Sequence, residues 1–487
     1  MGDRPDAAMG TDAARLAFQE TRRAFWDRVW SKEGKSFASR YYHRRLSTIY
    51  RFIVPEGSSV LELGCGQGDL LAELRPKDGM GVDFSGQALE QARARHSALR
   101  FVEGDVHDTP IDKDYDVVVL SDLINDVWDV QQVMEAALGA CRADSRLVLN
   151  FFNRAWQLPI GLARRLGLAQ PILKQNWLSV SDVANLLELA GFEVVSTSGE
   201  ILWPIGTPLV DAFFNRFLVK LWPFHHLGMT HFVVARPSPR RLRPPVGPEA
   251  TVSVVVPARN EAGHIREIIE RLPTMGSRTE LIFVEGNSTD DTYEVIKSEV
   301  DRLGDPSVRY YRQPGKGKGD AVRHGYSHAT GEVLMILDAD MTVAPEDLPR
   351  FFEALSEGTG EFVNGVRLVY PMEDEAMQFL NYLGNKLFGV AFTWLLRQPV
   401  KDTLCGTKVL TRRSYDLITA NRAYFGEFDP FGDFDLLFGA AKANLKIVDL
   451  PIRYRQRRYG ETNIDRWRHG ALLLRMTVFA ARKLRFI

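Results

Sequence analysis

Short apolar stretches alternate with longer amphipathic stretches along most of the chain. The apolar runs are rich in Val, Ile and Leu, which is typical of buried strands, and the segments between them place apolar residues at helical spacing. Strand and helix patterns that alternate in this way predict βαβ units and a mostly parallel sheet. The sequence therefore predicts an α/β fold.

The first half of the chain contains five such apolar runs. A helical N-terminal extension over 1–39 precedes them, because its apolar residues fall partly at helical spacing. The expected strands are 59–63, 79–83, 99–104, 116–120 and 146–151, and two of the expected helices are 85–96 and 130–141. The aromatic-rich segment 151–231 is expected to cover a substrate.

The second half repeats the pattern after a proline-rich seam. The seam begins Arg236-Pro-Ser-Pro-Arg, and proline removes backbone donors, so we expect an extended linker over 236–250. This division predicts one domain over 40–235, a second over 251–465, and a basic amphipathic segment over 466–487. The expected strands of the second half are 252–257, 280–285, 308–312 and 333–338.

The composition is that of an ordinary globular protein. The 487 residues are 45% hydrophobic and 25% charged, which excludes intrinsic disorder for most of the chain. The formal net charge of -1 argues against a nucleic-acid partner. The three cysteines, Cys65, Cys141 and Cys405, are odd in number and far apart, so we expect a reducing, cytoplasmic location.

The two ends of the chain bear on membrane association. The N-terminus lacks the apolar core of a signal peptide, and no apolar run reaches the roughly 20 residues that span a bilayer. The segment 466–487 combines apolar residues with four basic ones near its end. It suits peripheral contact with the anionic cytoplasmic face of a membrane, and it equally suits packing against its own domain.

A glycine-rich turn follows the first expected strand. Glycines at 64, 66 and 68 let the backbone approach a ligand closely, but Asp69 stands where a dinucleotide fingerprint requires a third spaced glycine. Glu62 adds a carboxylate beside the turn, which suits a cationic ligand better than a pyrophosphate. Asp83 ends the next strand, in the position that accepts hydrogen bonds from ribose hydroxyls.

With Asp105 after the third strand, residues 40–235 resemble a class I S-adenosylmethionine-dependent methyltransferase, which implies a Rossmann-like fold. The resemblance implies that Asp83 binds the ribose, that Asp105 lies near the adenine amine, and that Asp122 lines the sulfonium and acceptor pocket. It places Gly64, Gly66 and Gly68 around the methionine moiety, and Glu62 is a further candidate for the same cofactor site. A noncatalytic binding or scaffolding domain and a nicotinamide oxidoreductase are the alternatives.

In the second half, polar motifs follow the apolar strands. Asp338 and Asp340 end the fourth strand, and two acids so spaced can hold a divalent cation, Mg²⁺ or Mn²⁺, against a diphosphate. The cation would neutralise the departing nucleotide. The glycine-flanked Lys318 suits the approach of phosphate.

Residues 250–465 resemble glycosyltransferase family 2, especially the dolichyl-phosphate mannosyltransferase branch, which implies a GT-A-like fold and a nucleotide-sugar donor. Glu285 stands where the family usually has Asp, and Thr407 replaces its usual aromatic residue. The residues that match the donor-binding motifs are Pro257, Ala258, Asn260, Glu261, Glu285, Asp290, Lys318 and Asp338.

Two acceptors are compatible with these motifs. A polyprenyl phosphate is already anionic and would need fixed cations, for which Arg367 and Arg457 are the candidates. A hydroxyl acceptor would need a general base, for which Asp433 or Asp435 is the candidate. We therefore expect a bifunctional transferase, and a degenerate sugar-nucleotide binder is the alternative for the second half.

Overall fold

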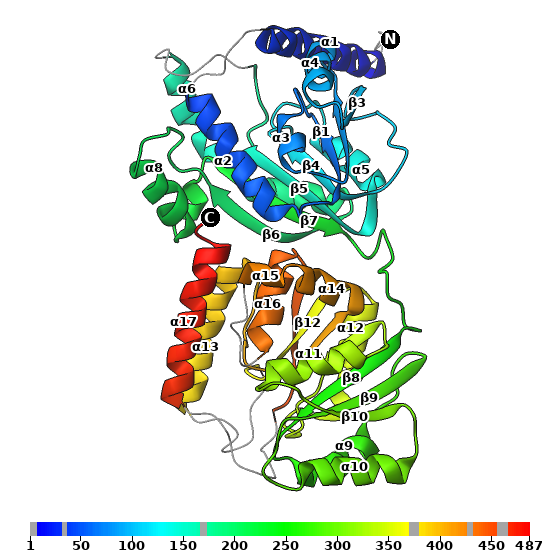
Figure 1. Cartoon of the computed structure of the whole chain (residues 1–487). Coiled ribbons are helices and arrows are strands. Elements are labelled where there is room, and N and C mark those ends of the chain that lie inside the picture. The colour runs from blue at the N-terminus through cyan, green and yellow to red at the C-terminus, as the bar shows by residue number, and fades with distance from the viewer. Residues whose placement is uncertain (1–6, 32–36, 166–172, 370–378, 426–431, 455–465) are drawn as a thin grey trace, which may run out of the picture. The chain divides into compact units, whose positions relative to one another are not determined.

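The computed structural model (Figure 1) describes residues 7–31, 37–165, 173–369, 379–425, 432–454 and 466–487. The chain divides into two compact units. The first unit comprises Met1–Leu242 with Phe486–Ile487, and the second comprises Arg243–Arg485. Each unit is built on its own seven-stranded sheet, so each is described separately.

The sheet of the first unit has the order β3-β2-β1-β4-β5-β7-β6. Strands β1 to β5 are parallel, and β7 runs antiparallel between β5 and β6. The segment expected to cover a substrate therefore completes the sheet with its two strands. The strands are β1 (Ser59–Leu63), β2 (Asp78–Asp83), β3 (Arg100–Glu103), β4 (Tyr115–Ser121), β5 (Cys141–Phe152), β6 (Phe192–Glu200) and β7 (Thr230–Pro237).

Successive side chains along the strands pack alternately into two separate hydrophobic cores, one on each face of the sheet. On β1, Leu61 and Leu63 pack into one core, whereas Val60 packs into the other, because successive strand side chains point to opposite faces. Helices α2, α3 and α4 cover one face, and α5 and α7 cover the other. The helices of this unit are α1 (Ala7–Trp30), α2 (Phe37–Ile53), α3 (Asp69–Glu73), α4 (Gly86–Arg95), α5 (Val130–Gly139), α6 (Gln157–Arg165), α7 (Val180–Leu189) and α8 (Val210–Ala212).

The second sheet has the order β10-β9-β8-β11-β13-β12-β14. Strands β8 to β11 pair in parallel, while β13 is antiparallel to both of its neighbours. The strands are β8 (Thr251–Ala258), β9 (Arg278–Glu285), β10 (Val308–Arg312), β11 (Val333–Ile336), β12 (Phe362–Val366), β13 (Lys408–Thr411) and β14 (Ile447–Pro451). The main helices are α9 (Ile265–Arg271), α10 (Thr292–Leu303), α11 (Lys318–His328), α12 (Leu348–Ser356), α13 (Phe379–Leu396), α14 (Arg412–Ala420), α15 (Arg422–Phe425), α16 (Asp433–Lys442) and α17 (Arg466–Leu484).

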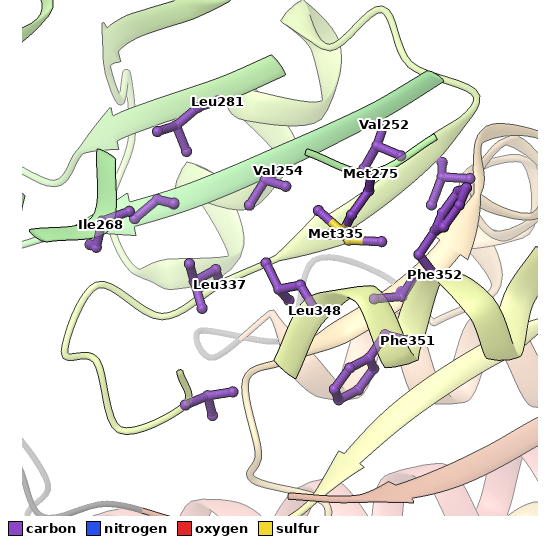
Figure 2. Close-up of a cluster of buried hydrophobic side chains, with 14 of the residues drawn as sticks. Val252, Val254, Ile268, Met275, Leu281, Met335, Leu337, Leu348, Phe351 and Phe352 are labelled. Atoms are coloured by element: carbon purple, nitrogen blue, oxygen red, sulfur yellow. The ribbon is translucent and has the colours of Figure 1, made fainter. Parts of the chain in front are cut away.

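The core of the second unit lies between the sheet and helices α9 and α12. Figure 2 shows Val254 of β8 and Leu337 beside Leu348 and Phe351 of α12, and all four side chains are fully buried. Burying a large apolar side chain contributes about 1.5–3 kcal/mol. This packing holds the strand end that carries Asp338 in a fixed position.

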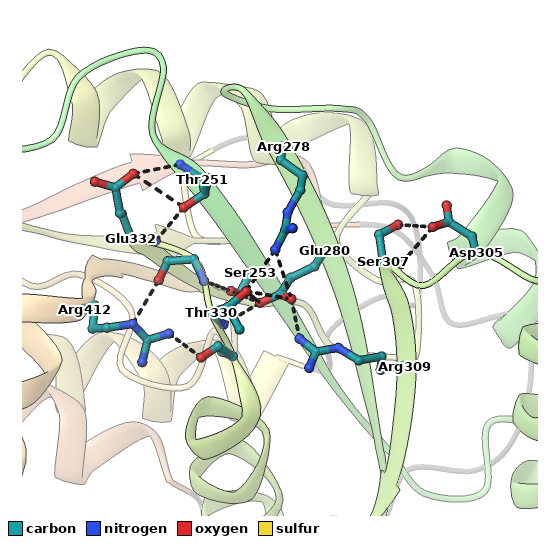
Figure 3. Close-up of polar contacts among 12 residues, drawn as sticks. Thr251, Ser253, Arg278, Glu280, Asp305, Ser307, Arg309, Thr330, Glu332 and Arg412 are labelled. Atoms are coloured by element: carbon teal, nitrogen blue, oxygen red, sulfur yellow. Dashed lines mark hydrogen bonds and ion pairs between the residues drawn. The ribbon is translucent and has the colours of Figure 1, made fainter.

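A polar network joins the amino-terminal parts of three strands of the same sheet (Figure 3). The buried Glu280 carboxylate of β9 accepts a hydrogen bond from Ser253 Oγ of β8 at 2.6 Å and pairs with Arg309 of β10. The Thr330 backbone N–H also donates to Glu280 at 2.6 Å. Because the network lies at the edge opposite the strand ends with the predicted motifs, we assign it to the stability of the sheet.

Several element boundaries differ from expectation. The expected helix 130–141 ends at Gly139, and Cys141 already begins β5, which is five residues longer at its start than predicted. Strand β7 continues to Pro237, inside the range expected to be linker, because Arg236 is buried and paired with Glu193 at 2.7 Å. Helix α2 likewise crosses the expected boundary at residue 40.

Within the described residues, no helix is both long and apolar enough to cross a bilayer.

Candidate active sites

Four parallel strands of the first unit end at one edge of the sheet, where a cavity of about 1330 Å³ lies. The loop after β1 lines it with Gly64 and Gly66, which like Gly68 have positive φ values that favour glycine. The ends of the neighbouring strands bring the other acids to the same cavity. Its lining includes Glu62, Gly64, Gly66, Asp83, Asp105 and Asp122.

Asp83 fixes the glycine loop to the end of β2. Its Oδ2 accepts a hydrogen bond from the Gly66 N–H at 2.8 Å, and its Oδ1 accepts one from the Ser85 N–H at 2.9 Å. Burial nevertheless raises the pKa of the Asp83 carboxyl above its usual range. Asp83 is thus an acceptor already oriented at the loop, where a ribose would lie.

Glu62 is a buried carboxylate at the floor of the glycine loop. In the part of the chain that the structure describes, its Oε2 atom has no hydrogen-bond partner, and the residue is 2% exposed. Burial raises its pKa well above the usual range for glutamate. A cationic ligand group would relieve this unfavourable burial, so the residue fits the ammonium or sulfonium of S-adenosylmethionine.

Helix α1 covers this cavity, which the sequence did not predict. Gln19 donates to the Asp105 carboxylate, and the stacked rings of Trp26 and Trp30 lie 5.7 Å apart over the glycine loop. A Cβ built on Gly66 would lie 3.0 Å from the Trp30 ring. The Gln19 amide therefore occupies one of the acceptor positions of the Asp105 carboxylate.

Asp122 follows β4 and lines the cavity. Its Oδ1 accepts hydrogen bonds from Tyr42 Oη at 2.8 Å and from Asn150 Nδ2 at 2.5 Å. Burial raises the pKa of Asp122 to about 6, although both hydrogen bonds oppose the rise. Tyr42 and Asn150 lie far from Asp122 in sequence and carry no motif, so no signal identified them.

The raised pKa of Asp122 leads to a stability prediction. The protonated form is favoured in the folded state, so this stabilisation is complete below the unfolded pKa of 3.8 and is lost as the pH rises through about 6. We expect the free energy of unfolding of Asp122→Asn, relative to that of the wild type, to rise by about 2 kcal/mol between pH 4 and pH 7.5. Hydrogen exchange of β4 and β5 peptides in urea measures this gain.

Asp116→Asn is the control of opposite sign. Although burial opposes it, hydrogen bonds from Ser59 lower the pKa of Asp116 to about 2, so its stabilisation is present above 3.8 and lost as the pH falls through about 2. This variant should be destabilised at neutral pH. A pH-independent effect of Asp122→Asn would contradict the prediction.

In the second unit, the loops after β8 and β9 hold each other at the carboxyl edge of the sheet. Asn260 Oδ1 accepts a hydrogen bond from the Thr289 N–H at 2.8 Å, and the Glu261 N–H donates to Thr292 Oγ1 at 2.9 Å. Asp290 accepts from the Thr292 N–H at 3.1 Å. Of the predicted donor-site residues, Pro257 and Ala258 lie in β8, and Glu285 is buried at the end of β9 with a hydrogen bond from the Ser288 N–H.

Asp338 and Asp340 follow β11 at the same edge. Asp338 Oδ1 pairs with Lys318 Nζ at 2.6 Å, and Asp340 Oδ1 accepts hydrogen bonds from Thr342. Burial, with the nearby charge of Asp338, raises the pKa of Asp340. A cation would offset this repulsion. The described residues contain no cluster of three metal-ligating side chains, so diphosphate and water would have to complete a Mg²⁺ shell, as is usual for this ion.

Gly406 brings the segment Asp402–Lys408 against these acids. A Cβ built on Gly406 would lie 2.0 Å from Asp338 Oδ2 and 2.2 Å from Lys318 Nζ. A larger residue would displace the ends of these two side chains, so glycine lets the backbone approach the ion pair closely. The sequence did not predict this contact.

The structure describes the contacts of two of the four candidate acceptor-side residues. Arg367 is bound in bidentate fashion by the buried Asp402, with Nε–Oδ2 at 2.7 Å and Nη2–Oδ1 at 2.9 Å, so these two guanidinium donors are occupied. Asp435 pairs with Arg422 at 3.3 Å, and burial raises its pKa. Arg457 and the side chain of Asp433 lie outside the described residues.

Comparison with known proteins finds a matching protein family for each unit. The profile of the Methyltransferase domain family matches residues 37–197, and that of Glycosyl transferase family 2 matches residues 253–417. A solved magnesium protoporphyrin IX methyltransferase from Synechocystis, with bound SAH, is 16% identical at a TM-score of 0.33, over 47% of this chain and 100% of that one.

Curated relatives match the second unit. Glycosyltransferase AglJ of Haloferax volcanii is 30% identical over 46% of this chain and 69% of its own length. Undecaprenyl-phosphate 4-deoxy-4-formamido-L-arabinose transferase of Klebsiella pneumoniae is 31% identical over 23% of this chain and 35% of its own length. Dolichol-phosphate mannosyltransferase of Pyrococcus furiosus is 26% identical over 44% and 59%. The chain belongs to glycosyltransferase family 2 through its second unit and carries a methyltransferase domain in its first.

Proposed function

We propose that the chain is a bifunctional enzyme that transfers a methyl group from S-adenosylmethionine in its first unit and a sugar from a nucleotide donor to a polyprenyl phosphate in its second. The observation that carries the proposal is the convergence of Asp338, Asp340, Lys318 and Gly406 at one sheet edge. The relatives named for undecaprenyl phosphate and dolichol phosphate support this acceptor class.

In the second unit, the protein would act mainly by positioning charge. Asp338 and Asp340 would hold Mg²⁺ or Mn²⁺, which would stabilise the negative charge of the nucleotide as it leaves. Lys318, now paired with Asp338, would be available to a donor phosphate once a cation binds the carboxylates. A phosphate acceptor is anionic near neutral pH, so this reaction needs no general base.

Arg367 would orient the acceptor rather than supply an unpaired charge. Asp402 fixes the guanidinium plane through two hydrogen bonds, and the Tyr454 ring centroid lies 5.1 Å from the guanidinium carbon. Arg457 is the second proposed acceptor residue. For a hydroxyl acceptor, Asp435 would have to be the base, and it pairs with Arg422 at 3.3 Å.

The outer side chains of α13 and α17 support a lipid-bearing acceptor. These helices lie side by side within the second unit (Figure 1). Leu387 and Val390 of α13 are 64% and 73% exposed, and Leu474 of α17 is 60% exposed. Arg475 and Arg482 of α17 are also exposed. Apolar and basic side chains together suit peripheral contact with an anionic bilayer on the cytoplasmic face.

In the first unit, the residues present fit S-adenosylmethionine. Glu62 offers a buried carboxylate oxygen to its cationic part, Asp83 offers acceptors to its ribose, and Asp105 offers one to its adenine. The bound cofactor would supply an electrophilic methyl group. Alignment of that group with a nucleophile can account for most of the rate, so the chain needs little further chemistry there.

One experiment tests both activities on the full-length protein. Each of a panel of nucleotide sugars is incubated with a short polyprenyl phosphate and Mg²⁺ or Mn²⁺. Mass spectrometry then identifies the lipid product by its mass. We expect transfer from one donor, loss with EDTA and recovery with added metal. Adding S-adenosylmethionine to the product mixture should then yield S-adenosylhomocysteine.

Each alternative predicts a different result. Transfer to a hydroxyl but never to polyprenyl phosphate would replace the proposed acceptor. Cofactor binding without any methylated product would make the first unit a binding module, and calorimetric binding of NAD instead of S-adenosylmethionine would make it an oxidoreductase. No transfer or hydrolysis with any donor would make the second unit a sugar-nucleotide binder.

A further inference from the structure

An exposed apolar surface lies in the segment between β6 and β7, away from the strand ends of the first unit. Leu209 is 85% exposed, Trp222 is 78% exposed and Phe213 is 55% exposed. We call residues 205–227 the aromatic surface. Its other exposed large apolar side chains are Ile205, Val210, Phe217, Leu221 and Leu227.

The aromatic surface contains one arginine, one lysine and one aspartate. Arg216 is exposed, whereas the single acid, Asp211, is half-buried, and Lys220 is buried against Glu200. Helix α6 adjoins the surface because Trp156 Nε1, in the turn before α6, donates to the Leu227 carbonyl at 2.7 Å.

Helix α6 also combines exposed apolar side chains with basic residues. Leu158 is 84% exposed and Leu162 is 59% exposed, and α6 contains arginines but no acid. Trp and Phe side chains beside arginines complement the boundary between acyl chains and anionic headgroups of a bilayer. A soluble acidic partner would not account for the number of apolar side chains.

A buried polar network holds the aromatic surface in place from beneath. Asn215 Oδ1 accepts hydrogen bonds from the backbone N–H groups of Leu202 at 2.7 Å and Trp203 at 2.8 Å. Asn215 Nδ2 donates to Tyr41 Oη at 2.8 Å, and Arg45 donates to the Asn215 carbonyl at 3.2 Å. Because the side chain and the carbonyl of Asn215 are both hydrogen-bonded, the outward apolar side chains are presented on a fixed backbone.

Helix α2 links this surface to the cavity. Tyr41 binds Asn215 beneath the surface, while the next residue, Tyr42, binds Asp122 in the cavity. From the exposed apolar groups, the exposed Arg216 with the arginines of α6, and the fixed backbone, we infer that the aromatic surface docks on an anionic lipid bilayer. Under the proposed function, this contact would bring a lipid-borne methyl acceptor to the cavity, but the docking does not depend on that activity.

Vesicle sedimentation of the full-length protein tests the inference without any substrate. Vesicles of phosphatidylcholine with phosphatidylglycerol should bind the protein more tightly than phosphatidylcholine alone, and added salt should weaken the binding. The double variant Leu209→Gln/Trp222→Gln should raise the half-saturating lipid concentration at least about tenfold. Both positions are exposed, so folding should be unchanged, which circular dichroism checks.

Two comparison variants distinguish the aromatic surface from other exposed apolar side chains of the chain. Leu189→Gln removes a 53% exposed leucine at the end of α7 in the same unit and should bind vesicles like the wild type. Leu474→Gln/Val478→Gln alters α17 instead. Loss of binding in the α17 variant combined with normal binding in Leu209→Gln/Trp222→Gln would overturn the inference. A wild-type dimer that the latter variant splits, with no vesicle binding, would make the surface a contact with a second copy and would also overturn it.

Discussion

Replacing Asp340 with alanine is expected to lower glycosyl transfer by about 10³-fold or more, with the second unit still folded. Asp340 is one of two carboxylates at the end of β11, and the other, Asp338, already pairs with Lys318. Without Asp340, a divalent cation would have one protein carboxylate left, that of Asp338. This carboxylate would first have to separate from Lys318. The charge on the departing nucleotide would then be poorly stabilised.

The fold should tolerate this change. Burial and the charge of Asp338 raise the pKa of Asp340, so the ionised carboxylate is unfavourable in the folded protein and its removal relieves repulsion. Thr342 loses two hydrogen bonds to Asp340 Oδ1, but it lies in the same turn and can bind water. The Asp340→Ala protein should therefore keep the thermal transition of the wild type.

The measurement combines rate and metal binding. Transfer to a polyprenyl phosphate is followed at increasing Mn²⁺, and calorimetry follows Mn²⁺ binding in the presence of nucleoside diphosphate. Asp301→Ala makes the same chemical change on the exposed side of α10 in the same unit and should leave both readouts unchanged. Full activity of Asp340→Ala at unchanged Mn²⁺ dependence would remove Asp340 from the proposed metal site.

Replacing Asp83 with alanine is expected to weaken S-adenosylmethionine binding by about 10²-fold. Asp83 Oδ2 and Oδ1 accept the Gly66 and Ser85 N–H groups, so the carboxylate both shapes the glycine loop and faces the expected ribose. Hydrogen bonds to a charged group contribute about 1.5–3 kcal/mol each, and about 3 kcal/mol corresponds to this loss of affinity.

Two further variants sharpen the Asp83 experiment, in which calorimetry of the full-length protein gives the dissociation constant. Asp83→Asn keeps one acceptor oxygen and should fall between the wild type and Asp83→Ala. Asp78→Ala alters the opposite end of the same strand, where Asp78 pairs with Arg100 at 3.1 Å, and should bind the cofactor normally. If Asp83→Ala bound S-adenosylmethionine like the wild type, the ribose assignment would be wrong.

Much of the parallel part of each sheet follows from local patterns. The strand that ends before Gly64 and the strand that ends before Asp338 were both predicted, because a short, mostly apolar run followed by a polar turn is a signal contained in a few consecutive residues. The convergence of Asp83, Asp105 and Asp122 also follows, since parallel strands end at the same edge. The predicted α/β class and its two motif-bearing units are confirmed.

The antiparallel strands could not be predicted from local sequence patterns in the same way. Strands β7 and β13 each lie between strands that are distant in the chain, so their positions depend on pairing partners rather than on their own composition. Linker residue Arg236 shows the same effect, because its pairing with Glu193 extends β7 beyond the point where proline content predicts an end. Nothing near Arg236 in sequence encodes that partner.

By itself, the sequence determined the local chemistry of this protein: which strands carry glycines, acids and a lysine at their ends, and hence which cofactor and donor classes suit each half. Only the tertiary structure decided how those groups are engaged. Gly406 against Asp338, Arg367 held by Asp402, Gln19 on Asp105 and the outward aromatic surface all join residues through space. The physical reason is that strand and turn preferences act within a few residues, whereas a contact between distant residues forms only when the packing of the whole unit places them together.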